Sequence, residues 1–182
     1  MGNALAGAAL ARGHQVTIVS GPVDVDYPPG CALIPVLSTE EMLAACQDIF
    51  PSCDGLIGVA APCDYRPIQV EPGKIHKNGE PLLLHLIETP DIVVTLGAAK
   101  KRQWIVGFAL ETDDRRLRAM AKLEKKSCDL VVLNGPEAMH SLDNSVEILD
   151  RQGEVLSTLS GPKEVIAQGI FQVIEERLIK PA

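Results

Sequence analysis

Residues 2–20 read GNALAGAALARGHQVTIVS and combine a helix and a strand of the kind that layered α/β folds contain. The first half, residues 2–12, is small and Ala-rich, which predicts a helix that can lie close against a sheet. Gly13 follows it and supplies the stop expected after a helix. Residues 15–20 form an apolar run that ends at a Gly-Pro pair, which predicts a buried strand.

The alternation of helix and strand continues along the chain. Apolar strand segments recur at residues 31–36, 54–60, 104–109 and 129–134, and two shorter ones near 145–149 and 154–159. Helices are expected from Ser38 or Thr39 to about Phe50, over the charged stretch 113–126, and from Gly161-Pro162 to near Lys180. This spacing predicts one α/β domain over residues 1–182, with a doubly wound, mostly parallel Rossmann-like sheet and helices on both faces.

One region, residues 60–88, interrupts the alternation. Its first part, AAPCDYRPIQVEPGK at residues 60–74, has three prolines and no helical period, so we expect a long loop. The stretch that follows contains Asn78-Gly79 between two extended segments, which predicts a projecting β-hairpin. Thr89-Pro90-Asp91 then opens a helix, with Pro90 at an early position where its missing N–H costs nothing.

Composition excludes several classes of function. The net charge is −7 and only 3% of the residues are aromatic. Nucleic-acid binding requires a cationic surface and stacking platforms, so we expect no nucleic-acid partner. A phosphate-bearing ligand must therefore be met by a local cluster of lysines.

The reactive side chains are sparse and unpatterned. The five cysteines form no C-x-x-C pair, which is typical of reduced thiols in a cytoplasmic protein. The four histidines show no ligand spacing, so no protein-held metal is expected. The chain has no apolar run of about 18 residues that would indicate a membrane span, and its first residues do not resemble a signal peptide.

Candidate site residues stand where strands are expected to end, because open α/β sheets bind ligands beyond the carboxyl ends of their strands. Asp64 follows one such strand and could accept hydrogen bonds from a sugar or a base, or simply stabilise its own turn. Lys74 and Lys77 are three apart in an extended segment, so at most one of them faces the site. A lysine there would stabilise charge on a departing pyrophosphate, although two solvated lysines are the simpler alternative.

A second group of candidates lies further along the chain. Lys122 and Lys126 are four apart on the helix expected at 113–126 and share a face, as a phosphate site or as solvated surface. Phe108 ends a strand and either stacks on a nucleobase or fills the core. Cys63 could be a nucleophile, but no histidine lies near it in sequence. The chain contains neither G-x-G-x-x-G nor G-x-x-x-x-G-K-[ST].

Taken in order, seven segments resemble one family. They are MGNALAGAALARGHQVTIVSGP, AAPCDYRP, GKIHK, TPDIV, VGFALET, KLEKKSCDLVVLN and DNSVEIL. These look like the successive motifs of bacterial phosphopantothenate–cysteine ligases, and the resemblance covers nearly all 182 residues. That family uses CTP and Mg²⁺ to convert the carboxylate of 4′-phosphopantothenate into an acyl-cytidylate, with release of pyrophosphate. Cysteine then attacks through its amine, and CMP leaves.

The resemblance also implies roles for residues of this chain. Asp64 would bind the nucleotide, and Gly58, Val59 and Ala60 would line its pocket with backbone groups. Lys74 would meet the phosphates and assist the activation step. The remaining implied nucleotide-binding residues are Pro90, Asp91, Ile92, Val93, Phe108, Lys122 and Lys126. Mg²⁺ would be held through the nucleotide phosphates, with no metal ligand from the protein.

The resemblance further implies partners and a longer sheet. A homodimer through the hairpin region 74–88 and an association with a phosphopantothenoylcysteine decarboxylase are expected. Family members carry a strand and a Ser/Gly-rich phosphate loop before the equivalent of Met1, and that strand would lie beside residues 54–60. We expect this opening strand and loop to be absent here, which would compromise activity. Cys63, Glu88 and Thr89 also depart from the residues usual in the family. The alternatives are an NAD(P)-dependent Rossmann oxidoreductase and a non-catalytic nucleotide-binding remnant.

Overall fold

A computed structural model describes residues 1–110, 120, 123–134 and 144–179, which leaves most of the predicted helix 113–126 outside the described residues. The first half of the chain forms α1 (Gly2–Ala11), β1 (Thr17–Ser20), β2 (Ala32–Pro35), α2 (Thr39–Ile49), a 3₁₀ turn (Phe50–Ser52) and β3 (Gly55–Gly58). The rest forms β4 (Tyr65–Pro67), β5 (Leu86–Glu88), α3 (Ile92–Ala99), β6 (Trp104–Leu110), β7 (Leu130–Asn134), β8 (Asn144–Asp150), β9 (Val155–Gly161), α5 (Lys163–Ile174) and a π-helical turn (Glu175–Ile179).

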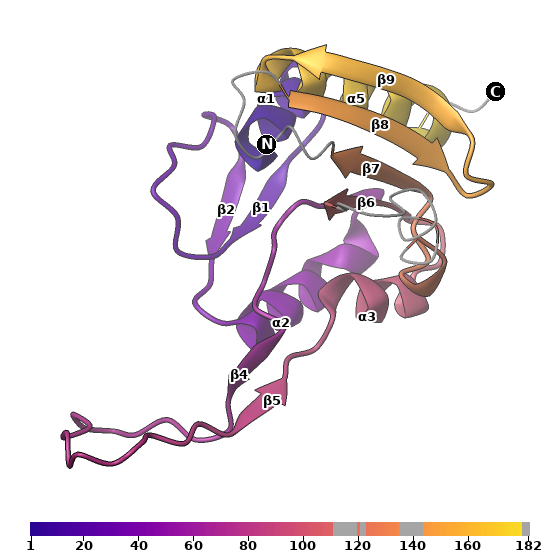
Figure 1. Ribbon diagram of the computed structural model, residues 1–182. Helices are drawn as coiled ribbons and strands as arrows, with labels where there is room; N and C mark the ends of the chain where they lie inside the picture. Colours follow the sequence, from indigo (N-terminus) through magenta and orange to yellow (C-terminus); the bar gives the residue numbers. More distant parts are fainter. Residues whose placement is uncertain (111–119, 121–122, 135–143, 180–182) are drawn as a thin grey trace.

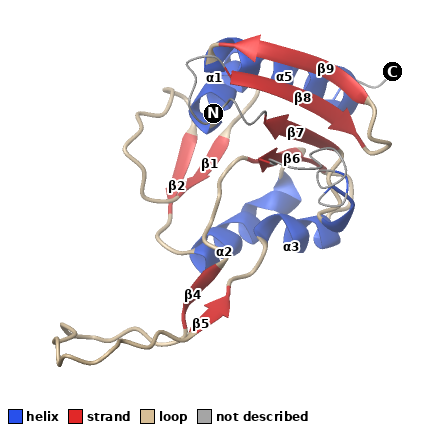
Figure 2. Cartoon of the chain, viewed as in Figure 1, coloured by secondary structure: helices blue, strands red, loops and turns tan. Residues whose placement is uncertain are grey.

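The central sheet has five strands in the order β3-β6-β7-β8-β9. β3, β6 and β7 are parallel, and β8 and β9 continue the sheet as antiparallel neighbours. Figure 2 shows α1 and α5 on one face of this sheet and α2 and α3 on the other. The predicted α/β class, with helices on both faces, is confirmed.

Two apolar clusters, one on each face, hold the layers together. On the face covered by α1 and α5, the cluster includes Leu5, Val106, Val132, Ile148 and Ile170. On the face covered by α2 and α3, it includes Phe50, Leu96, Ile105, Val131 and Leu133. Adjacent residues of one strand therefore enter different clusters, because successive side chains of a strand point to opposite faces.

β1 and β2 pair in parallel with each other and form a sheet of their own. Val16, next to β1, nevertheless packs on the α1/α5 cluster, whereas Val19 packs on the α2/α3 cluster. β1 thus lies between the same two helical layers as the central sheet, but the described strands include none between β1 and β3. The apolar residues of β1 and β3 are only half-buried, in contrast to the fully buried first four residues of β7.

Local chemistry explains where the helices begin. Ser38 caps α2 by accepting a hydrogen bond from the Glu41 amide, and the Glu41 side chain returns to the Ser38 amide, which completes a capping box. Asp91 caps α3, because its side chain accepts from the Val94 amide at 3.1 Å. The prediction that Pro90 occupies the first turn of this helix was therefore wrong, since Pro90 precedes the cap.

The region 60–88 projects from the body as a long arm (Figure 1), and every residue in it is exposed. Gly79 adopts a positive φ of 82°, so the predicted turn at Asn78-Gly79 is present. Strand pairing is confined to the base of the arm, where β4 pairs with β5. The prediction of an irregular loop over 60–74 missed β4, and the hairpin pairing expected within 74–88 is absent from the described ladder.

Candidate functional site

The carboxyl end of β3 forms the centre of the candidate site. Gly58 is the last residue of β3, and Val59 and Ala60 continue from it. Val93, in the first turn of α3, lies so close to Gly58 that a Cβ built there would be 3.0 Å from Val93 Cγ2. Glycine at position 58 therefore lets the start of α3 approach the strand end, which brings two predicted segments together.

The start of α1 lies at the same end of β3. A Cβ built on Gly2 would be 4.0 Å from Val59 Cγ1, and the described residues give no side-chain cap to the first turn of α1. Asn3, in this turn, donates to the Asp26 carbonyl at 3.2 Å, whereas its Oδ1 is buried without a hydrogen-bond partner among the described atoms. The helix was predicted at residues 2–12 and is observed at Gly2–Ala11, but Gly2 and Asn3 were not among the predicted site residues.

Asp64 is brought toward the start of α3 by its backbone. Its carbonyl accepts a hydrogen bond from the Thr89 amide at 2.9 Å, and the Thr89 hydroxyl donates to the Cys63 carbonyl. The carboxylate of Asp64 is exposed. The two segments of the arm, which lead outward and back, are thus hydrogen-bonded to each other directly beside Pro90.

Asp91 and Lys126 form an ion pair at the start of α3. Lys126 Nζ lies 3.1 Å from Asp91 Oδ2. Partial burial favours the neutral form of Asp91, but hydrogen bonds from the Val94 amide and the Lys126 ammonium outweigh it and lower the pKa of Asp91. Asp91 therefore stays ionised at neutral pH, and its carboxylate pairs with Lys126 in this structure.

Phe108 is half-buried and packs against the α1/α5 cluster. Val93 and Ile92 belong to the α2/α3 cluster, on the opposite face of the sheet. Phe108 and the start of α3 can therefore reach a common ligand only past the ends of β3 and β6. The Gly58–Gly107 register puts Phe108 one residue beyond that pair, at the same level as Val59.

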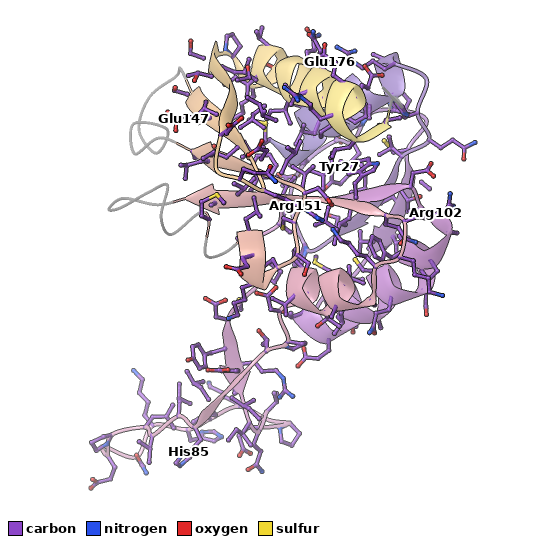
Figure 3. All side chains as sticks on the ribbon, turned by 90° about the vertical axis from the view of Figure 1, so that its right-hand side faces the viewer. Tyr27, His85, Arg102, Glu147, Arg151 and Glu176 are labelled. Atoms are coloured by element: carbon purple, nitrogen blue, oxygen red, sulfur yellow. The ribbon has the colours of Figure 1, made fainter. Side chains whose placement is uncertain are left out.

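Two predicted lysines are not part of this cluster. Lys74 lies in the exposed arm, which extends away from the body; Figure 3 labels His85 on the same arm. Lys122 lies outside the described residues. The base of the arm is attached to the body by an ion pair between Arg66 and Glu40, a residue of the first turn of α2.

Metal-binding clusters are absent from the part of the chain that the structure describes, where no group of three or more His, Cys, Asp or Glu side chains could hold a metal ion. Cys63 is exposed, and the described contacts give it no histidine neighbour. None of the described helices has the length and apolarity that crossing a membrane requires.

A family profile matches residues 1–178 of the chain, and its description is "DNA/pantothenate metabolism flavoprotein C-terminal domain". The chain is also similar to the coenzyme A biosynthesis bifunctional protein CoaBC of Vibrio parahaemolyticus. That relative is 35% identical over 97% of this chain and 46% of its own length. The CoaBC protein of Bacillus subtilis is 42% identical over 76% of this chain and 34% of its own length.

A solved structure shares the fold. The C-terminal domain of a coenzyme A biosynthesis bifunctional protein CoaBC superimposes with a TM-score of 0.80 at 31% identity. The match covers 97% of this chain and 81% of that one. The chain thus spans most of that domain, but less than half the length of the two curated relatives.

Proposed function

Because this chain belongs to the family of the DNA/pantothenate metabolism flavoprotein C-terminal domain, we propose that it joins 4′-phosphopantothenate to cysteine. The names of the CoaBC relatives support a role in coenzyme A biosynthesis. The nucleotide is CTP, and the carboxylate of phosphopantothenate is activated as an acyl-cytidylate before the cysteine amine attacks. A cytoplasmic location and an association with the matching decarboxylase belong to the same proposal.

One observation carries the proposal. Residues from five separate segments meet at the carboxyl end of β3: Gly2 of α1, Gly58 and Val59, Asp64, Asp91 and Lys126. This is the end of an open α/β sheet at which ligands bind. Lys126, the uncapped start of α1 and the exposed side chain of Asp64 make this edge polar. Such an edge suits a nucleotide better than an apolar ligand.

The proposed roles follow from chemistry and position. Exposed Asp64 accepts hydrogen bonds from the nucleoside, and the backbone of Gly58, Val59 and Ala60 lines the pocket. Lys126 offsets phosphate charge from the α3 side, with Lys122 as its proposed neighbour. Mg²⁺ would be held through the phosphates of bound CTP and would neutralise part of their charge.

A homodimer is part of the proposal, because the arm is apolar as well as exposed. Ile68, Val70, Leu82, Leu83 and Leu84 are each at least 60% exposed. An exposed apolar surface of this extent is typical of an interface. Paired arms of two copies would bury these side chains. Each arm extends away from the body of its own chain, so pairing would also carry Lys74 to the site of the other copy.

A further strand between β1 and β3 would complete the sheet, and we propose that such a strand leads directly into α1. α1 begins beside Val59, so a strand that leads into α1 would end at the carboxyl end of β3 and run parallel to it. Such a strand would cover the half-buried apolar residues of β1 and β3. It also would bring its following loop to the uncapped start of α1, where phosphate groups bind well.

The test of this function is pyrophosphate release on mixing protein, Mg²⁺, CTP, 4′-phosphopantothenate and cysteine. We expect release that needs both CTP and phosphopantothenate, and amide product that also needs cysteine. The assay compares the 182-residue chain with a version extended upstream of Met1, and activity is expected to be much higher in the extended version. Absence of release from both versions, or tight binding of NADPH in place of CTP, would contradict the proposal.

A further inference from the structure

The two carboxylate oxygens of Asp91 have different partners. One oxygen of Asp91, Oδ1, accepts from the Val94 amide at 3.1 Å and caps α3. The other, Oδ2, lies 3.1 Å from Lys126 Nζ. The same carboxylate therefore stabilises a helix start and neutralises Lys126, the lysine proposed to offset phosphate charge.

The backbone at Lys126 is held firmly by α3. A Cβ built on Gly97 would lie 2.3 Å from the Lys126 carbonyl oxygen, so only glycine permits this approach. Ser127 takes a positive φ of 50°, a conformation that costs free energy in a residue other than glycine. Lys100 Nζ donates to the Ser127 carbonyl at 2.6 Å and pairs with Asp129 at 2.8 Å.

These contacts leave the Lys126 side chain as the movable part. It runs along α3, from the level of Gly97 to Asp91 at the helix start. The side chains of Lys126 and Asp91 are 30% and 40% exposed, so solvent and solutes reach the pair. Val93 connects this point to Gly58, which puts the pair at the edge of the proposed nucleotide pocket.

We propose that Asp91 is an intramolecular placeholder for a phosphate group of the ligand. In the free protein the carboxylate occupies the anion position at Lys126. A bound phosphate takes this position, and Asp91 keeps its hydrogen bond to Val94 while it gives up the lysine. The cost of displacing Asp91 weakens the binding of any phosphate and discriminates against ligands with too little negative charge. The identification of the ligand as CTP rests on the proposed function, whereas the exchange at Lys126 concerns phosphate in general.

Asp91→Asn isolates the exchange from the helix cap. Asparagine caps helices about as well as aspartate, so the fold and its unfolding midpoint are expected to change little. With the competing charge gone, inorganic tripolyphosphate is expected to bind about two- to fivefold more tightly at low salt, the size of a solvent-accessible ion pair. The measurement is isothermal titration calorimetry on the whole chain. Lys126→Met is expected to weaken binding, and Asp91→Asn added to Lys126→Met is expected to give no gain.

Asp54→Asn is the matched control, because it makes the same change in net charge at the other end of β3. Asp54 pairs with Arg102 at 3.7 Å and is 85% exposed. It is expected to leave tripolyphosphate affinity within the error of the wild-type value. Equal gains from both variants, no gain from Asp91→Asn, or no binding to any variant would overturn the placeholder role.

The same titrations separate this inference from the proposed function. If CTP binds more tightly than tripolyphosphate and gains equally from Asp91→Asn, both are supported. If tripolyphosphate shows the gain but CTP binds no better than it does, the placeholder role is supported and the nucleotide proposal is wrong.

Discussion

Lys74→Met is expected to lower ligase turnover by about 10²- to 10³-fold in the active protein, the usual loss when one group that stabilises transition-state charge is removed. The reason is that a lysine beside the phosphates offsets charge that develops as pyrophosphate leaves. Because Lys74 is exposed in the arm, its loss should leave the unfolding midpoint unchanged. The measurement is the steady-state rate of pyrophosphate release at saturating CTP.

Lys77→Met is the control for this variant. It removes the same charge from the same exposed arm, three residues away, on the opposite side of an extended chain. We expect it to keep most of the activity. Equal losses from both variants would mean that the arm contributes only general electrostatics, and Lys74 would then have no specific role.

Mixing of variants tests whether the arm acts on a second copy. Lys74→Met and Lys126→Met chains, assayed at a CTP concentration at which each alone is strongly impaired, are expected to recover roughly a quarter of wild-type activity when subunits of a two-fold dimer exchange randomly. The recovery arises because the mixed dimer has one site with both lysines intact. No recovery after proven exchange would show that each arm serves the site of its own chain.

Gly97→Ala is expected to destabilise the protein by about 1–3 kcal/mol, the usual range for overpacking a tight contact. Helix propensity alone predicts the reverse, a gain of about 1 kcal/mol for Ala over Gly within a helix. The contact decides the sign, because a Cβ at Gly97 would lie 2.3 Å from the Lys126 carbonyl oxygen, and a main-chain atom cannot move away easily. Denaturant unfolding followed by circular dichroism measures the change.

Gly7 offers a matched comparison within α1. A Cβ at Gly7 would meet only Pro28 Cγ, at an ordinary contact distance of 3.8 Å. Gly7→Ala is therefore expected to be neutral or to stabilise by up to about 1 kcal/mol. If Gly97→Ala were as stable as Gly7→Ala, the close contact between α3 and Lys126 would be wrong.

The layers of the fold could be predicted from local sequence. The helix expected from Ser38 or Thr39 to about Phe50 is observed as α2, Thr39–Ile49, because its capping box is written in neighbouring residues. The turn at Gly79 was equally local. By contrast, β4 has three residues including a proline and pairs with a segment some twenty positions later. A pairing of that kind depends on the course of the whole arm, so no short pattern predicts it.

The candidate site was less predictable than the fold. The rule that ligands bind beyond the carboxyl ends of parallel strands pointed to the end of the strand expected at 54–60, and Gly58 lies there beside Val93. Asp91 and Lys126 were suggested through the family resemblance, and they pair at the start of α3. Sequence order could not tell that Phe108 faces the α1/α5 cluster, because alternation along a strand does not say which face is which. It also could not predict the Asp91–Lys126 pair, which depends on Gly97 and on tertiary packing.

Mapping CTP onto the protein would locate the proposed nucleotide pocket. Backbone amide signals of the isotope-labelled protein are followed by NMR during titration with CTP and Mg²⁺. We predict that the largest shifts occur at Gly58 to Ala60 and at Asp91 to Val93, at the carboxyl end of β3. Shifts concentrated at the opposite end of the sheet, around Leu130 and Arg151, or no shifts at all, would contradict it.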